Sequence, residues 1–200
     1  MLILSGGGDP EQVRPIDEFF ADRIDKTKRV LYVPVAMERE VSTYEQCLDW
    51  FTSVYTPFGI QSIEMLTDLQ NAAIPADTAA VFIGGGNTYK LLKELRENKF
   101  DRQLISYLDN GGIVYGGSAG AMIFGETIET EIHTGSKNYG LTDLSAFNLL
   151  NGHDLWCHYT PADDHLITEY RRPLYILTEE SGLIVQKGEI TSIGAPYKKQ

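Results

Sequence analysis

The sequence predicts an α/β fold of three layers, in which a mostly parallel β-sheet is covered by helices on both faces. Short apolar runs rich in β-branched and aromatic residues alternate with segments whose apolar residues recur at helical spacing. Glycine-rich turns follow three of these runs, at residues 6–8, 84–86 and 116–120. Because the carboxyl ends of parallel strands meet at one edge of a sheet, we expect ligands to bind at that edge.

The strands of the predicted sheet come mainly from the first 115 residues. The apolar runs place them at 2–4, 30–35, 60–66, 79–83 and 113–115. Later runs at 155–158, 174–177, 183–186 and 189–193 also read as strands, and Lys187-Gly188 turns the last two into a hairpin. Residues 126–151 have a weak pattern that indicates loops with a possible hairpin.

The predicted helices lie between these strands. Helical spacing and capping signals place them at 14–25, 42–55, 88–97, 101–109 and 119–124. The helix at 42–55 begins at a capping-box pattern, Ser42-Thr43-Tyr44-Glu45, and Pro57 and Gly59 end it.

Composition limits the class of protein and its partners. With 200 residues, of which 42% are hydrophobic, we expect residues 1–200 to form a single catalytic domain. The net charge of −11 disfavours nucleic acid and anionic membranes as partners, and an acidic substrate would need a local cation. No run is apolar and long enough for a membrane helix, and no signal peptide is expected. Two cysteines without a metal-binding pattern favour a cytoplasmic location.

The turn Gly116-Gly117-Ser118-Ala119-Gly120 matches the G-x-S-x-G elbow that presents a nucleophilic serine. A predicted strand precedes it and a predicted helix follows it, as the elbow requires. Such a turn exposes the Ser118 hydroxyl and directs the N–H of Ala119 toward an oxyanion. A plain glycine-rich turn is the alternative interpretation.

A serine hydroxyl needs a general base. Among His133, His153, His158 and His165, we favour His158, because it follows a predicted strand and precedes a predicted turn. His133 lies in a poorly patterned segment and stays an alternative. The neighbouring Cys157 would point to the opposite face of the strand, which is more typical of a small core residue than of a nucleophile.

Three blocks of the sequence resemble the peptidase E (aspartyl dipeptidase) and cyanophycinase family of serine peptidases. They are residues 83–92 (IGGGNTYKLL), 117–121 (GSAGA) and 157–159 (CHY). The resemblance implies a fold like that of the class I glutamine amidotransferases and no metal or organic cofactor. It also implies Ser118 as nucleophile, His158 as base, and the N–H groups of Gly86 and Ala119 as the oxyanion hole.

The third member of the triad departs from the aspartyl dipeptidase pattern. The position of its Asp aligns with His133, and no Asp occurs between Ser118 and Asp143. Cyanophycinases use a Glu in a later segment, which aligns best with Glu179 here. We therefore expect Glu179 to orient His158, with Glu180, Glu131, His133 and Asp143 as the alternatives.

The function expected from this resemblance is hydrolysis of short peptides through an acyl-enzyme, with Asp-containing dipeptides or isopeptides as candidate substrates. Arg171 and Arg172 are the candidate cations for an Asp side chain, with solvated charges at a helix end as the alternative interpretation. Asn87 is a further candidate substrate-binding residue. The family also suggests a homodimer. A non-catalytic binding or regulatory module on the same scaffold is the main alternative, and an esterase or amidase of non-peptide substrates is another.

Overall fold

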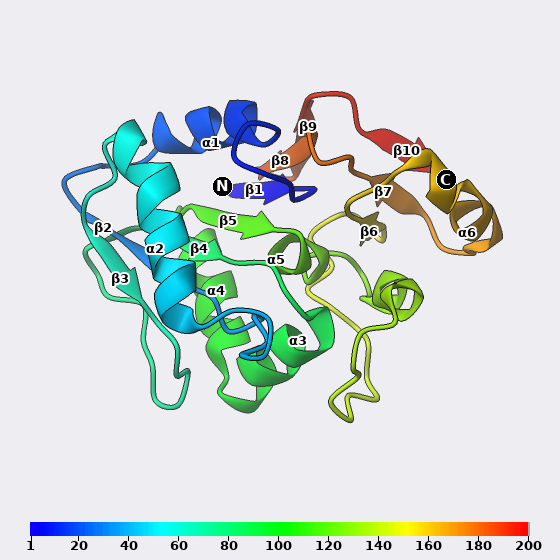
Figure 1. Cartoon of the computed structure of the whole chain (residues 1–200), viewed down its shortest axis with the longest axis horizontal. Coiled ribbons are helices and arrows are strands. Elements are labelled where there is room, and N and C mark those ends of the chain that lie inside the picture. Colours follow the sequence, from blue (N-terminus) through cyan, green and yellow to red (C-terminus); the bar gives the residue numbers. More distant parts are fainter. Residues whose placement is uncertain (200) are drawn as a thin grey trace.

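The computed structural model describes residues 1–199, and its centre is a seven-stranded mixed sheet (Figure 1). The strands are β1 (Leu2–Ser5), β2 (Arg29–Val33), β3 (Ile63–Met65), β4 (Thr78–Ile83), β5 (Val114–Gly117), β8 (Gly182–Gln186) and β9 (Glu189–Ile193). Their order across the sheet is β3-β2-β4-β5-β1-β8-β9. The five strands from β3 to β1 are parallel, and β8 and β9 extend the sheet in antiparallel pairing.

A second, three-stranded sheet lies beside the carboxyl ends of the parallel strands. It consists of β6 (Asp154–Trp156), β7 (Leu174–Ile176) and β10 (Tyr197–Lys199), in the order β10-β7-β6. In Figure 1 the arrowhead of β5 points toward this sheet. The segments that connect the two sheets therefore cross the edge at which the sequence predicts a ligand site.

Helices cover both faces of the large sheet, as predicted. α1 (Arg14–Ala21) and α2 (Tyr44–Tyr55) pack on one face, and α3 (Thr88–Glu97), α4 (Phe100–Asp109) and α5 (Ala119–Met122) pack on the other. The other helical segments are η1 (Thr56–Phe58), η2 (Glu129–Thr134), η3 (Pro161–Asp163) and α6 (Asp164–Glu169). None of the helices in residues 1–199 has the length and apolar character needed to cross a bilayer.

The alternation of side chains along β1 explains why two helical layers are stable. Ile3 packs into the cluster of α1 and α2, whereas Leu2 and Leu4 pack into the cluster of α3, α4 and α5. All three side chains are almost completely buried. A central parallel strand that is apolar on both faces in this way requires cover on both sides.

Several predicted boundaries were wrong. The first helix ends at Ala21 rather than at residue 25, and α5 spans only four residues. The capping box of α2 joins Thr43 with Gln46, one position later than predicted. α6 and β10 were not predicted. In the segment 126–151, where a hairpin was considered possible, Thr127 and Ser145 form an isolated antiparallel bridge.

Candidate active site

Ser118 occupies a strained turn between β5 and α5. Its backbone has φ 51° and ψ −114°, a conformation that few residues other than glycine adopt. The turn is so tight that a Cβ on Gly116 would lie 2.2 Å from the carbonyl oxygen of Gly120. The Ser118 amide donates to the carbonyl of Ser5 at the end of β1. This is the strand–turn–helix context that the elbow pattern requires.

His158 lies beside Ser118, although 40 residues separate them in the chain. Its Nε2 atom is 2.8 Å from Ser118 Oγ. The residue follows β6 by two positions and also has a positive φ, 55°. Its amide donates to the carbonyl of Gly6. A nucleophile and a base within hydrogen-bond distance are the central requirement of serine catalysis.

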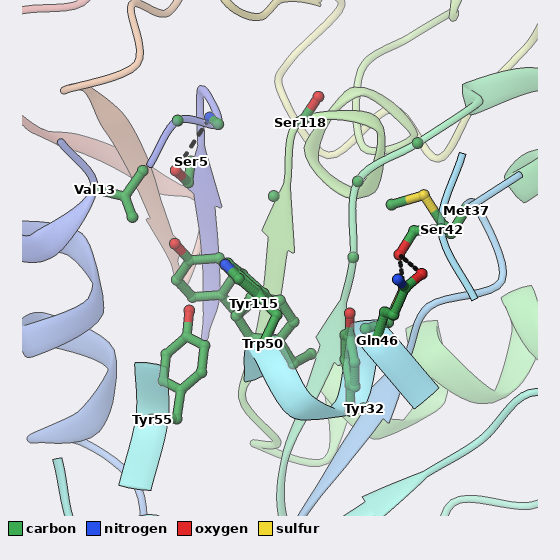
Figure 2. Close-up of a pocket in the computed structure, with 18 of the residues that line it drawn as sticks. Ser5, Val13, Tyr32, Met37, Ser42, Gln46, Trp50, Tyr55, Tyr115 and Ser118 are labelled. Carbon is green, nitrogen blue, oxygen red and sulfur yellow. Dashed lines mark hydrogen bonds between the residues drawn. The ribbon is translucent and has the colours of Figure 1, made fainter. Parts of the chain in front are cut away.

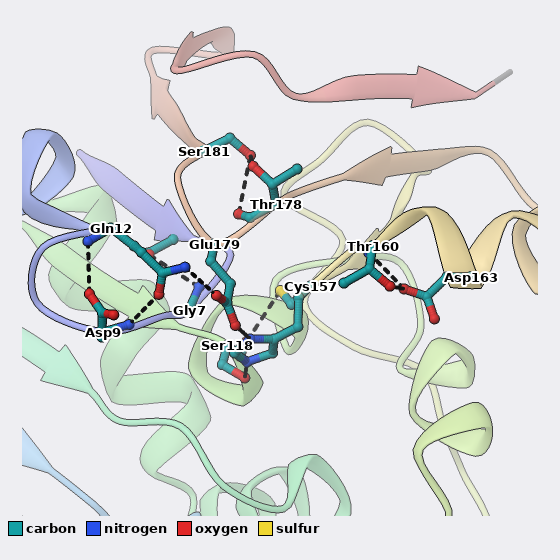
Figure 3. A network of polar contacts seen from close by, with 12 residues as sticks. Gly7, Asp9, Gln12, Ser118, Cys157, Thr160, Asp163, Thr178, Glu179 and Ser181 are labelled. Carbon is teal, nitrogen blue, oxygen red and sulfur yellow. Dashed lines mark hydrogen bonds and ion pairs between the residues drawn. The ribbon is translucent and has the colours of Figure 1, made fainter.

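Glu179 joins His158 and Gln12 in a chain of polar contacts, in which Figure 3 labels Glu179 and Gln12. Its Oε1 lies 3.2 Å from His158 Nδ1, and its Oε2 accepts a hydrogen bond of 2.6 Å from Gln12 Nε2. Gln12 is itself held by the amide of Asp9, which donates to Gln12 Oε1. A carboxylate in this place can fix the imidazole tautomer that leaves Nε2 free to accept the serine proton.

The other candidates for the third position have different partners. Asp143 pairs with Arg96, Glu131 accepts a hydrogen bond from the Thr88 hydroxyl, and Glu180 is exposed. His133 packs against the ring of Trp156, with ring centroids 5.4 Å apart.

Cys157 is half-buried against the elbow, and its Sγ lies 3.7 Å from the carbonyl oxygen of Ser118. Burial, and next the charge of Glu131, raises the pKa of its thiol far above the usual value. Because the thiolate is the nucleophilic form, this environment disfavours a Cys–His mechanism.

The carboxyl end of β1 supports both reacting groups. Ser5 and Gly6 accept the amides of Ser118 and His158, and Gly7 packs directly against the side chains of the pair. A Cβ on Gly7 would lie 2.5 Å from His158 Cε1 and 3.0 Å from Ser118 Cβ. No role was predicted for Gly7 or Gln12. The run of glycines at 6–8 is the one signal in the sequence for a close approach of the backbone to the side chains of Ser118 and His158.

The amides of Gly86 and Ala119, which lie near Ser118, donate to no acceptor within residues 1–199. The loop that contains Gly86 lies against the elbow, since a Cβ on Gly85 would be 3.3 Å from Ser118 Cβ. Both amides are therefore candidates to hold the oxyanion of a tetrahedral intermediate.

Two pockets meet at Ser118. The first, of about 470 Å³, is lined by Gly86, Ser118 and His158 and by a group of aromatic side chains. These aromatic residues are Tyr32, Trp50, Tyr55, Phe82 and Tyr115. Figure 2 shows Tyr55, Tyr115 and Tyr32 below Ser118 in the view. This pocket suits a large apolar or aromatic group that carries few hydrogen-bonding atoms.

The second pocket has a similar volume, about 480 Å³, and a different chemistry. It shares Gly86, Ser118 and His158 with the first pocket, and its wall includes Glu131 and Asp163. Within residues 1–199, neither pocket is lined by a lysine or an arginine.

Arg172 and Asn87, the predicted substrate-binding residues, are not brought to Ser118. The guanidinium of Arg172 pairs with Asp154 and Glu126, next to the small sheet. The Asn87 side chain caps α3 by accepting from the amide of Lys90, and its amide group donates to the carbonyl of Lys137. Both side chains stabilise the fold, and neither lines the two pockets.

Comparison with known proteins gives a family and a set of relatives. The sequence model of Peptidase family S51 matches residues 1–193. Peptidase E of Actinobacillus pleuropneumoniae serotype 3 (strain JL03) is 25% identical over 195 residues, which cover 89% of this chain and 79% of that protein. Peptidase E of Haemophilus influenzae (strain ATCC 51907 / DSM 11121 / KW20 / Rd) is 31% identical over 137 residues, covering 65% of this chain and 61% of the relative.

Solved structures agree with the fold. A protein from Listeria monocytogenes EGD-e superposes with a TM-score of 0.76 at 23% identity, over 96% of both chains. A peptidase from an acI-B1 Actinobacterium superposes with a TM-score of 0.65 at 16% identity, over 97% of this chain and 87% of the other. These likenesses confirm the predicted three-layer α/β fold.

Proposed function

Since the chain belongs to peptidase family S51, we propose that it is a serine peptidase that hydrolyses short peptides through an acyl-enzyme on Ser118. One observation carries the proposal. Ser118 Oγ, the His158 imidazole and the Glu179 carboxylate form a continuous line of contacts of 2.8 and 3.2 Å. Ser118 and His158 line both pockets, so that a peptide could extend to both sides of Ser118.

The proposed reaction has two steps. Ser118 Oγ attacks the peptide carbonyl carbon while its proton passes to His158 Nε2, and the amides of Gly86 and Ala119 hold the oxyanion. His158 then gives the proton to the leaving amine, and the C–N bond breaks. In the second step His158 takes a proton from water, which attacks the acyl carbon, and the proton returns to Ser118 as the acid leaves.

Glu179 would act by holding His158 in one tautomer and by stabilising the imidazolium that forms in each step. Gln12 would hold the carboxylate through its second oxygen. The side chains of His158 and Glu179 are 47% and 40% exposed, so peptide binding would also have to limit the access of water to them.

We do not extend the proposal to a preference for Asp. A carboxylate in a cleft of this acidic chain would need a cation within hydrogen-bond distance. Neither Arg171 nor Arg172, the candidates for that role, lines either pocket, and Arg172 pairs with Asp154 and Glu126. We expect hydrolysis of Asp-Leu to be no faster than hydrolysis of Ala-Leu.

The test is a screen of dipeptides and simple esters with the wild-type chain and with Ser118→Ala. We expect peptide hydrolysis that falls at least about 10³-fold in Ser118→Ala, because the variant lacks the nucleophile. Ser62→Ala, which changes an exposed serine outside both pockets, is the matched control. Hydrolysis of esters without hydrolysis of any peptide would contradict the peptidase proposal, and unchanged activity in Ser118→Ala would contradict the mechanism.

A further inference from the structure

Glu131 is a buried acid that the proposed reaction does not use. Its side chain is on η2, and the residue is only 3% exposed. The Thr88 hydroxyl donates to its Oε2 atom at 2.8 Å. Its Oε1 atom accepts no hydrogen bond from residues 1–199, and no lysine, arginine or histidine in that part of the chain forms an ion pair with it. The carboxylate thus has a single hydroxyl partner.

The Glu131 carboxylate lies in a pocket that a ligand can enter, and a ligand could therefore supply the partner that the carboxylate lacks. Glu131 lines the pocket of about 480 Å³ that reaches Ser118 and His158. An ionised carboxylate that is buried without a cation is costly, and such groups are normally paired. In this pocket a ligand would supply the missing positive charge.

The rest of the pocket favours the same ligand. Asp163 adds a second carboxylate to the wall, and no lysine or arginine in the described residues lines it. Met122, Trp156 and Leu166 provide apolar surroundings, in which a charge–charge contact is stronger than in water. The net charge of −11 also attracts cations to the molecule over longer distances.

We propose that the Glu131 carboxylate recognises a positively charged ammonium or guanidinium group of the peptide substrate, in the pocket beside Ser118. This inference rests on the proposed function and names the class of substrate. The charge comes either from the α-ammonium of an N-terminal residue or from a lysine or arginine side chain. The first source would make the enzyme an exopeptidase, and the second would make it selective for a basic side chain.

Three peptides of similar size separate these sources. Norleucyl-leucine carries only the α-ammonium, acetyl-lysyl-leucine carries only the side-chain ammonium, and acetyl-norleucyl-leucine carries neither. Their dissociation constants are measured by calorimetry on the Ser118→Ala chain, so that the result does not depend on turnover. Hydrolysis by the wild-type chain is measured separately and tests the proposed function.

We expect at least one ammonium peptide to bind at least about tenfold more tightly than acetyl-norleucyl-leucine. The tighter of the two identifies the source of the charge. Glu131→Gln, added to the Ser118→Ala chain, keeps an acceptor for Thr88 and removes the charge. In this double variant the dissociation constants of the ammonium peptide and of acetyl-norleucyl-leucine should differ by no more than about twofold. Glu129→Gln is the matched control, because Glu129 lies on the same short helix and does not line the pocket.

Equal binding of the three peptides to the Ser118→Ala chain would overturn the inference, and this comparison does not require the Glu131 variant to fold. A preference for ammonium that persists in a folded Glu131→Gln variant would also overturn it, since another group would then bind the charge. If the binding preference is found but the wild-type chain hydrolyses none of the peptides, the inference stands and the proposed function fails.

Discussion

Ser118 and His158 both have a positive φ angle, which is unfavourable for residues with side chains. Their φ angles are 51° and 55°, and their amides are anchored on the carbonyls of Ser5 and Gly6. Such strain persists only where surrounding contacts hold it, and it is common at active sites. Here the two anchors come from the same strand end, so that one short segment sets the position of both side chains.

If His158 is the base, His158→Ala should lower kcat/KM almost as much as Ser118→Ala, by at least about 10³-fold. The double variant should lose little more, because the two groups act as one unit. Steady-state kinetics on a hydrolysed peptide measures this. His133→Ala is the control, since His133 lines the same pocket but packs on Trp156. A large loss in His133→Ala with a small loss in His158→Ala would reverse the assignment.

Glu179 offers a separate test of the orienting role. Glu179→Gln should lower kcat by about 10²–10⁴-fold, because the amide can hold the wrong tautomer of His158. The melting temperature should change little, since the side chain is 40% exposed. Glu180→Gln, which changes the exposed neighbouring acid, should keep its activity. Equal activity of the two variants would mean that Glu179 does not orient the base.

At the level of single residues, a local pattern alone predicts Ser118 as the nucleophile, because a five-residue turn between a strand and a helix is a local structure. The predictions of His158 and Glu179 depend mainly on the family resemblance. The bond between Gln12 and Glu179 joins residues 167 positions apart, and no local pattern could indicate it. Arg172 and Asn87 are the opposite case, since each is a plausible ligand-binding residue in the sequence whose side chain the fold uses elsewhere.

Among the elements, the segment after β1 contributes most to the site. Gly7 has φ 85° and no room for a side chain, because its Cβ would meet the His158 ring at 2.5 Å. The segment continues to Gln12, which holds Glu179. The end of β1 thus contacts all three members of the proposed triad, either directly or through one side chain.

Gly7→Ala should therefore damage activity more than stability. Gly111→Ala is a close control, because Gly111 has φ 86° and, apart from its two chain neighbours, no residue within 1–199 lies within 4 Å of its Cβ position. Both variants should lose on the order of 1 kcal/mol of unfolding free energy from the left-handed backbone alone. Only Gly7→Ala should lower kcat/KM, by about 10²-fold, through displacement of the imidazole. Urea unfolding and kinetics measure the two effects, and equal activity would show that His158 adjusts freely.

The elements that the sequence predicts well are those with strong periodicity. α3 coincides with the predicted range, 88–97, because its apolar residues recur regularly and Asn87 caps it. α6 and β10 are short, and tertiary contacts stabilise them. β10 pairs with β7. Lys199 Nζ on β10 donates to the carbonyl of Thr168 in α6 and to that of Tyr170, just after the helix. Contacts between segments far apart in the chain cannot be predicted from a local sequence pattern.

On the scale of the whole molecule, a buried carboxyl links the helical layer to the sheet. Asp17 on α1 is 1% exposed, and the hydroxyls of Tyr55 on α2 and Tyr115 on β5 both donate to its Oδ1. Its Oδ2 atom has no hydrogen-bond partner among residues 1–199. Burial raises the pKa of Asp17 to about 6, against the opposing effect of the two tyrosine hydrogen bonds.

This shift predicts a pH dependence of stability. Between the ordinary carboxyl pKa of 3.8 and about 6, the folded chain holds a proton at Asp17 that the unfolded chain has lost. The contribution of Asp17 to stability is therefore fully present below pH 3.8 and is lost as the pH rises through about 6. Relative to Asp17→Asn, which does not titrate, the wild-type chain should lose about 2 kcal/mol of unfolding free energy between pH 4 and pH 7.

Urea unfolding of both chains at the two pH values measures this difference, and other titrating groups cancel in the comparison. Asp22→Asn provides a control for the loss of one acid, because Asp22 lies just after α1 and is exposed. A difference between wild type and Asp17→Asn that does not change with pH would show that Asp17 has no raised pKa.

If His158 activates Ser118 as a nucleophile, a covalent probe of serine hydrolases should react with Ser118. The wild-type chain and His158→Ala are treated with a fluorophosphonate, and the modified residue is located by mass spectrometry of peptide fragments. We expect a phosphonylated Ser118 in the wild-type chain and at least about a 10²-fold slower reaction in His158→Ala. No modification of the folded wild-type chain, or modification of a serine other than Ser118, would contradict it.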